Sequence, residues 1–457
     1  MGNGRTSAQR QPCVIARILA LAAPSAAVSA AQVFTQFAET LVAAKLGTGA
    51  LAAWSITLPF VLLLQQTSAG AMGGGVSSAI ARALGANDQA QACALVKHAL
   101  WIALVAGLVF AIPLSIFLPW LIGRLAGDEI AQLNRFYPFA AFGLAAVPAW
   151  LVNTLSAILR GGGQHRIVGR LMVSAWLVLC TMMPLCALIF ELGLAGIGLA
   201  QALVFTVAAW LMWQKVRAGQ AGFVPDLTLK PQLILFKKIL SVGLIACALA
   251  LIANLTTFLV NARLAAFGTA YVAAYGIAAR VEFLMVPVAF GVGAALTALV
   301  GHAVGSGQWQ QARRIAWTGA AIAFVVTMPF GLWVAIWPDV LASFFTSDPK
   351  VQVHAATALS YLGWGLAPFA VGMTLYFASQ GANRMRGPLL AGMLRISIAV
   401  GLGALLAQHL QPAASAYYLS VACAITIYGL VVALSVRPGV WSEPSVSKSL
   451  ANLNDRR

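Results

Sequence analysis

The chain has 457 residues, of which 61% are hydrophobic and only 9% are charged, and its mean hydropathy is +0.88. A soluble domain carries about 25% charged residues, so this composition excludes a water-soluble protein and predicts an integral membrane protein in a lipid bilayer. The net charge of +17 is no sign of a nucleic-acid partner, because the basic residues lie in short loops between apolar runs.

Twelve apolar segments follow one another along the chain, separated by turns such as LGTG, ALGAND and TSDPK. Each is longer than the roughly 20 residues that a helix needs to cross a bilayer. We therefore expect an all-α membrane protein, whose first apolar run continues past Ala31 and is a span rather than a cleaved signal peptide. The predicted spans are residues 15–43, 50–79, 93–120, 134–158, 167–190, 193–214, 238–264, 270–300, 314–338, 354–379, 387–408 and 413–436.

The basic residues sort by side when the chain is divided into these spans. Of the 28 Lys and Arg residues, 22 lie on the side of the N-terminus, five lie on the other side, and Arg280 lies inside a span. The positive-inside rule then places both termini in the cytoplasm of a bacterial cell, with the spans in its inner membrane.

The two halves of the chain repeat each other. LGTGALAAWSI (46–56) and FGTAYVAAYGI (267–277) share five of eleven positions, at an offset of 221 residues. ALGANDQAQA (83–92) matches AVGSGQWQQA (303–312), and LRGGGQHR (159–166) matches SQGANRMR (379–386), both at an offset of 220 residues. Since six spans per copy is an even number, the repeat is parallel, and a pseudo-two-fold axis along the membrane normal relates two lobes around a cavity.

This repeat predicts five regions along the chain. They are a cytoplasmic N-tail (1–14), an N-lobe with spans 1–6 (15–216), a cytoplasmic inter-lobe loop (217–237), a C-lobe with spans 7–12 (238–436) and a cytoplasmic C-tail (437–457).

A series of motifs over about residues 15–436 resembles the MATE (multidrug and toxic compound extrusion) family of transporters. An acid followed by LVAAKLGTGALAAW, and then SAGAMGGGVSSAIARALGAND, is similar to its first two helices. AAYGIAARVEFLMVPVAFGVGAALTALVGHAVGSG resembles its eighth helix, and LRGGGQHR resembles the loop after its fourth. The resemblance implies a secondary antiporter, with no cofactor, that exports organic, cationic and amphipathic small molecules in exchange for H⁺ or, less favoured, Na⁺. We expect a monomer.

Other functions remain open at this point. The closest alternative is a flippase or exporter of a lipid-linked or other specific metabolite in the wider MATE-related superfamily, which predicts a more basic cavity than Arg280 alone provides. A major-facilitator transporter is disfavoured because loop 2–3 lacks a GxxxDRxGRR-like pattern. An enzyme is not expected, since the chain has no HExxH, GxSxG or GxxxxGK[ST] motif.

Two acids, Glu39 and Glu282, lie within apolar spans and are the candidates for proton or cation coupling. An ionisable group at the centre of a membrane helix costs at least about 2.5–3.5 kcal/mol, so it indicates a function. Glu39 ends a polar stripe whose spacings of three and four residues put it on one face of a helix, as the wall of a wet cavity. The alternative is that the stripe only bonds neighbouring helices. Its other members are Ser25, Ser29, Gln32 and Gln36.

The family resemblance leaves the partners of Glu39 open. That position is usually Asp in the family, and the Asn and Asp of its fifth helix correspond here to Leu179 and Met183. We therefore look for supporting polar residues elsewhere in the same lobe, namely Gln65, Gln66, Asn153 and Thr154.

Glu282 lies two residues after Arg280, about 200° around a helix, so the two side chains cannot pair with each other. It fits the family's ARVE-like stretch, yet a structural ion pair with another helix is an alternative to coupling. The sodium-coupled branch carries acids in helices 7 and 10, where this chain has Asn254, Asn261 and Gly372. This favours the proton-coupled, DinF-like type.

Three tyrosines are candidates for stacking on a cationic substrate, or else for lobe packing: Tyr275, Tyr361 and Tyr376.

Overall fold

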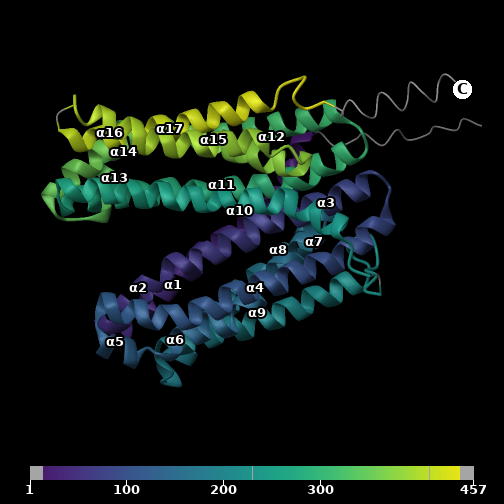
Figure 1. Ribbon diagram of the computed structural model, residues 1–457, viewed down its shortest axis with the longest axis horizontal. Helices are drawn as coiled ribbons and strands as arrows, with labels where there is room; N and C mark the ends of the chain where they lie inside the picture. The colour runs from purple at the N-terminus through teal and green to yellow at the C-terminus, as the bar shows by residue number, and fades with distance from the viewer. Residues whose placement is uncertain (1–13, 229, 411, 443–457) are drawn as a thin grey trace, which may run out of the picture.

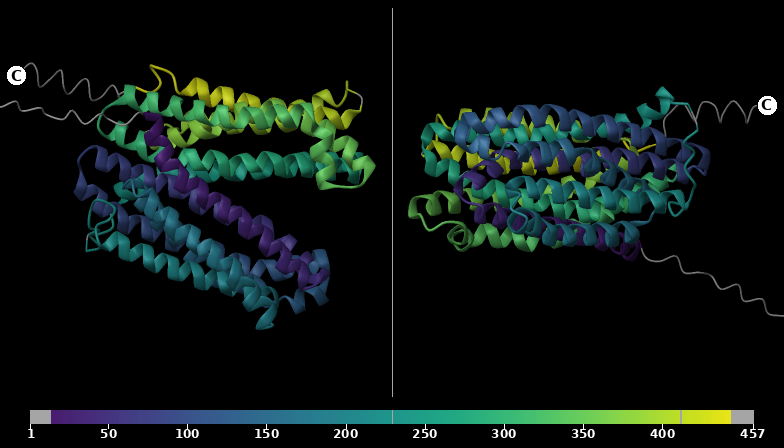
Figure 2. Two further views of the ribbon diagram at one scale, coloured as in Figure 1. Left: turned by 180° about the vertical axis from the view of Figure 1, so that it is seen from behind. Right: turned by 90° about the horizontal axis from the view of Figure 1, so that it is seen from below.

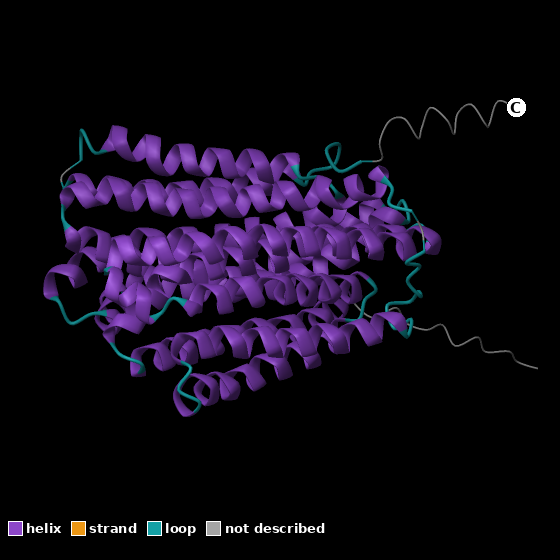
Figure 3. Cartoon of the chain, turned by 60° about the horizontal axis from the view of Figure 1, so that its bottom comes forward, coloured by secondary structure: helices purple, strands orange, loops and turns teal. Residues whose placement is uncertain are grey.

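The computed structural model describes residues 14–228, 230–410 and 412–442 (Figure 1). Within these ranges every regular element is a helix, as Figure 3 shows by its colours. The predicted tails, 1–14 and 437–457, fall largely outside the described residues.

Twelve helical segments of the described chain are long and apolar enough to cross a membrane, which confirms the all-α fold with twelve spans. Those of the first half are α1 (Val14–Lys45), α2 (Thr48–Gln65) continued by α3 (Gly73–Gly85), α4 (Gln89–Ala126), α6 (Phe136–Pro138) continued by α7 (Ala146–Gly161), α8 (His165–Pro184) and α9 (Gly193–Arg217). Those of the second half are α10 (Leu233–Leu264), α11 (Thr269–Gly305), α12 (Trp309–Ile336), α14 (Pro349–Ala382), α15 (Arg386–Ile396) continued to α16 (Gly403–Leu406) and α17 (Ala413–Ser435). Two short helices lie outside the spans, α5 (Asp128–Leu133) and α13 (Pro338–Phe345).

Several spans contain irregular turns that the hydropathy pattern does not predict. Four are π-helical: η1 (Gln66–Met72), η2 (Phe139–Leu144), η3 (Leu185–Ile189) and η5 (Ser397–Leu402), whereas η4 (Ala265–Phe267) is a 3₁₀ turn. A π-helical turn loosens the regular backbone ladder and is often found at a functional site. The turn η1 places polar side chains in the middle of the second span.

The helices form two bundles that diverge toward one end of the molecule (Figure 1). Helices α1–α9 make up the first bundle and α10–α17 the second, and α10 and α11 form the edge of the second bundle that faces the first. We call the end that carries the joining segment 218–232 the connected end, and the opposite end, with α5, α6 and α13, the far end. The buried apolar side chains form two large clusters that follow this division, around Trp150 and around Phe369.

Helix α1 crosses from one bundle to the other, as the view from behind shows (Figure 2). At the connected end, Ile18 is buried in the cluster of the second bundle. Farther along the same helix, Val28 and Val42 are buried in the cluster of the first bundle. The far half of α1 therefore stands on the first bundle, beside the space where the bundles diverge.

The bundles meet at the connected end through a pair of glycines related by the sequence repeat. A Cβ atom on Gly85 at the end of α3 would meet the backbone carbonyl of His302, and one on Gly305 at the end of α11 would meet that of Arg82. Both pairs are related by the offset of 220 residues that the loop motifs share. The two helix ends thus touch each other's backbone, and only glycine permits this approach.

Candidate functional site

Glu39 lies in the far half of α1 and faces the inside of the first bundle. Its carboxylate accepts a hydrogen bond of 3.0 Å from the indole Nε1 of Trp54 on α2. The fully buried Tyr137 of α6 lies close enough to interact with it electrostatically. Glu39 itself is half-buried. The structure thus places one carboxylate, with neutral neighbours, at the edge of a packed bundle.

The rest of the predicted stripe also lies on the inner side of α1. Ser25 and Ser29 are buried, and Ser25 Oγ lies 3.4 Å from Nδ1 of the buried His165. Gln32 and Gln36 are half-buried, as Glu39 is. The structure therefore brings the five polar residues together along one helix face, and their part in transport stays a prediction.

Trp54 is the partner of Glu39 that the sequence analysis missed. Two of the polar residues expected there, Gln65 and Asn153, form a cluster with Ser68, in which Asn153 Nδ2 donates to Ser68 Oγ over 2.8 Å and to Gln65 Oε1 over 3.4 Å. The position of the turn between α1 and α2 could have predicted this contact, because Glu39 precedes the turn and Trp54 follows it by similar numbers of residues. Antiparallel neighbouring helices bring such positions to the same height.

The turn η1 and α3 join the two bundles through polar contacts. Gln66 Oε1 accepts a 3.0 Å hydrogen bond from Asn254 Nδ2 of α10, and Gln380 Nε2 of α14 donates to the Gly70 carbonyl over 3.3 Å. Arg82 of α3 donates to the carbonyls of Gln380 and Gly381. Asn261, the other predicted polar residue of α10, has a buried Oδ1 without a hydrogen-bond partner among the described residues. The hydrogen bonds named here between the bundles therefore join two neutral groups, or the Arg82 guanidinium and a neutral carbonyl.

Glu282 does not face the space between the bundles. It points into the second bundle and forms a buried ion pair with Arg395 of α15. Arg395 was among the 22 basic residues that we counted on the N-terminal side, as part of loop 10–11, and Arg280 was the one basic residue that we placed within a span. That assignment is wrong, because Arg395 lies well inside the span 386–406, with its guanidinium 5.2 Å from the centre of the Phe369 ring.

The second bundle leaves little room beside this ion pair. The hollow next to Glu282 has a volume of about 10 Å³, close to what one water molecule needs, and Tyr275 and Tyr418 are among its lining residues. Of the three tyrosines considered for substrate binding, Tyr275 and Tyr376 are buried and Tyr361 is half-buried. Their placement inside the bundle is that of packing residues, and a contact with substrate stays a prediction.

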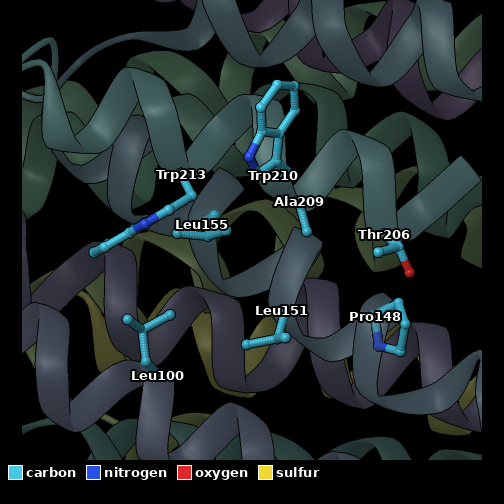
Figure 4. A pocket seen from close by; sticks show the side chains of 8 residues that line it. All are labelled: Leu100, Pro148, Leu151, Leu155, Thr206, Ala209, Trp210 and Trp213. Atoms are coloured by element: carbon cyan, nitrogen blue, oxygen red, sulfur yellow. The ribbon is translucent and has the colours of Figure 1, made fainter.

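A larger groove lies on the first bundle, between α4, α7 and α9. It has a volume of about 320 Å³ and is lined by apolar side chains and one threonine (Figure 4). No ionisable residue lines it, and its indole rings, from Trp210 and Trp213, belong to α9. This groove therefore offers no means of coupling to an ion, and the candidate site is the Glu39 region.

Comparison with known proteins agrees with this architecture. The MatE family model matches residues 24–188 and 246–405. A protein described as a FAD transporter from Shewanella oneidensis is 24% identical over 373 residues, which cover 79% of this chain and 80% of that protein. A probable multidrug resistance protein NorM from Rhodopseudomonas palustris is 28% identical over 411 residues, which cover 82% of this chain and 81% of that protein.

Solved structures share the fold over nearly the whole chain. A MOP superfamily transporter from Pyrococcus furiosus superposes with a TM-score of 0.84 at 21% identity, covering 93% of this chain and 96% of that one. The MATE transporter VcmN from Vibrio cholerae, in its bent form, gives a TM-score of 0.84 at 18% identity, covering 94% and 99%.

Proposed function

The chain belongs to the MatE family of transporters, and on that premise we propose that it exports organic compounds in exchange for protons, with Glu39 binding the proton. Members of this family are multi-pass membrane transporters for small molecules rather than enzymes. Family membership does not identify the substrate or the coupling ion, so both are part of the proposal.

The observation that carries the proposal is the difference between the two intramembrane acids. Glu282 is compensated by Arg395, so its loss or gain of a proton breaks or forms a buried ion pair. Glu39 is hydrogen-bonded to a neutral indole N–H and is half-buried, so it can change its charge without separating an ion pair. Placing an ionisable acid within the membrane costs free energy, and an acid that lacks a fixed counter-ion there is suited to proton exchange.

Alternating access supplies the transport cycle in this proposal. The bundles touch at the connected end and diverge at the far end (Figure 1). The charge bias of the loops orients the connected end, with both termini, toward the cytoplasm of a bacterial inner membrane. In this proposal the arrangement of the bundles is the outward-open form of the cycle, and the protein works as a monomer whose two lobes are the walls of the pathway.

Sodium is the less favoured coupling ion. Sodium prefers several oxygen ligands, and the far half of α10 offers the amides of Asn254 and Asn261 but no carboxylate. A second candidate function is the export of one specific metabolite rather than of many compounds. It is favoured by the similarity to the Shewanella oneidensis FAD transporter, which extends over 79% of this chain.

The test is dissipation of a pH gradient in everted membrane vesicles. A panel of cationic dyes, flavins and neutral drugs is added with and without sodium, to wild type, Glu39→Gln and Glu282→Gln. We expect some compound to collapse the gradient in wild type without sodium, and Glu39→Gln to abolish the response at wild-type protein levels. A full response from Glu39→Gln would refute its role, and a response that requires sodium would refute proton coupling.

A further inference from the structure

Arg280 is an ionisable residue of α11 that has no part in the proposed proton pathway. Unlike Glu282, two positions later, it is exposed, although it lies within an apolar span. A guanidinium at such a depth is costly unless it faces water or a charged partner. Its placement therefore calls for a functional explanation.

The face of α11 that carries Arg280 is turned toward α1. Gly291, which lies eleven residues after Arg280, packs against Ala26 of α1, since a Cβ on this glycine would lie 3.1 Å from the Ala26 Cβ. Eleven residues of α-helix bring the chain back to within about 20° of the same direction. Leu284 and Val288, at intermediate positions on this side, are exposed as well. Arg280 thus points to the side of the first bundle, where α1 and α11 have separated.

Eleven residues along α1 from its contact with α11, toward the far end, the helix carries an exposed aromatic ring. Phe37 lies eleven residues beyond Ala26 toward the far end, and its exposed fraction is 66%. Because α1 and α11 run in opposite directions, Phe37 and Arg280 both lie toward the far end, each roughly 16 Å along its own helix from the contact of Ala26 with Gly291. Glu39, two residues later, lies on the other side of α1 and bonds Trp54.

The exposed charges on the four helices beside this space are positive, whereas the exposed acids of the far end, Asp128 and Glu129, lie on α5. In the far halves of α1, α2, α10 and α11, the exposed charged residues are Lys45, Arg263 and Arg280. The two acids of these helices face into the bundles, and one of them is paired. An anionic group placed beside Arg280 would be attracted to its guanidinium.

From these positions we infer that Arg280 and Phe37 form a substrate subsite for an aromatic compound that carries an anionic group. The phenyl ring of Phe37 supplies a stacking surface on one wall, and the guanidinium of Arg280 binds a phosphate or carboxylate from the other. This inference rests on the proposed export function and departs from the cationic substrates that the sequence analysis expected. It names the substrate class as aromatic organic anions, and the coupling residue Glu39 lies outside the subsite.

The test uses flavins that share one ring system and differ in charge. Binding of riboflavin, FMN and FAD to the purified full-length protein in detergent is measured by quenching of flavin fluorescence. Carboxyfluorescein is a carboxylate probe, and ethidium is a cationic one. The variants are Arg280→Gln, Arg280→Lys and Phe37→Ala, with Arg217→Gln at the exposed end of α9 as the control for loss of one positive charge.

We expect wild type and Arg217→Gln to bind FMN at least tenfold more tightly than riboflavin. Arg280→Gln should remove this preference, Arg280→Lys should keep part of it, and Phe37→Ala should weaken both flavins by the same factor. If the affinity for carboxyfluorescein changes across the variants as that for FMN does, the subsite accepts any anionic group. If it does not change in this way, the subsite requires phosphate.

Equal affinity of wild type for FMN and riboflavin would overturn the inference. An Arg280→Gln variant that binds FMN within twofold of wild type, or tighter binding of ethidium than of every anion, would overturn it too. Because binding is read without a pH gradient, a failure of proton coupling leaves these outcomes unchanged, so the two proposals fail separately.

Discussion

Breaking the Glu282–Arg395 pair is expected to destabilise the protein rather than to uncouple it. The two side chains are only 5% and 7% exposed, respectively, and the Arg395 guanidinium packs on Phe369. Glu282→Gln leaves that guanidinium buried without its counter-ion, which costs about 3–5 kcal/mol. Replacing both partners by uncharged residues of similar size costs much less, because no isolated charge remains.

Thermal unfolding of the purified protein, followed by tryptophan fluorescence, measures this effect. We expect Glu282→Gln to melt several degrees below wild type and the double variant Glu282→Gln/Arg395→Met to recover more than half of the loss. Glu129→Gln, on the exposed surface of α5, is the matched control and should melt like wild type. The folded fraction of Glu282→Gln should still exchange protons. A variant that melts like wild type but exchanges none would refute this reasoning and make Glu282 a coupling residue.

Two further predictions address the indole partner of Glu39 and the contact at the connected end. Trp54→Phe keeps a ring but removes the donor to the carboxylate. Since a hydrogen bond to a charged group is worth about 1.5–3 kcal/mol, we expect proton-driven export, measured at equal amounts of folded protein, to fall about tenfold. An unchanged export rate would show that this bond has no part in transport. Gly85→Val would collide with the His302 carbonyl and hold the connected end apart, so alkylation of Cys247 between the bundles in everted vesicles should become several times faster. Gly401→Val is the control, because no atom stands within 4 Å of the added Cβ. Equal alkylation rates for the two variants would contradict the contact between Gly85 and His302.

The twelve spans could be predicted because hydropathy acts on contiguous residues, and the ends of each span are marked by glycine, proline and charge. The same holds for the polar stripe from Ser25 to Glu39, whose spacing alone puts it on one face of α1. Both features depend on local periodicity, which a single sequence displays directly.

The partners of the two acids could not be predicted in the same way. Arg395 is separated from Glu282 by 113 positions, and its pairing depends on how α15 packs beside α11. Its position ten residues into a short span made it look like part of the basic loop before it. Trp54 was not predicted as a partner of Glu39, although the short turn between α1 and α2 brings it beside that carboxylate. Packing between helices decides such contacts, and hydropathy carries no information about it.

Proton release on substrate binding tests the role of Glu39 most directly. Purified protein in a weakly buffered solution is mixed with a compound that collapses the pH gradient in vesicles, and the pH is followed with an indicator dye. We expect wild type to release protons on binding, and Glu39→Gln to bind the compound but release none. Proton release from Glu39→Gln equal to that of wild type would show that the exchanged proton is held elsewhere.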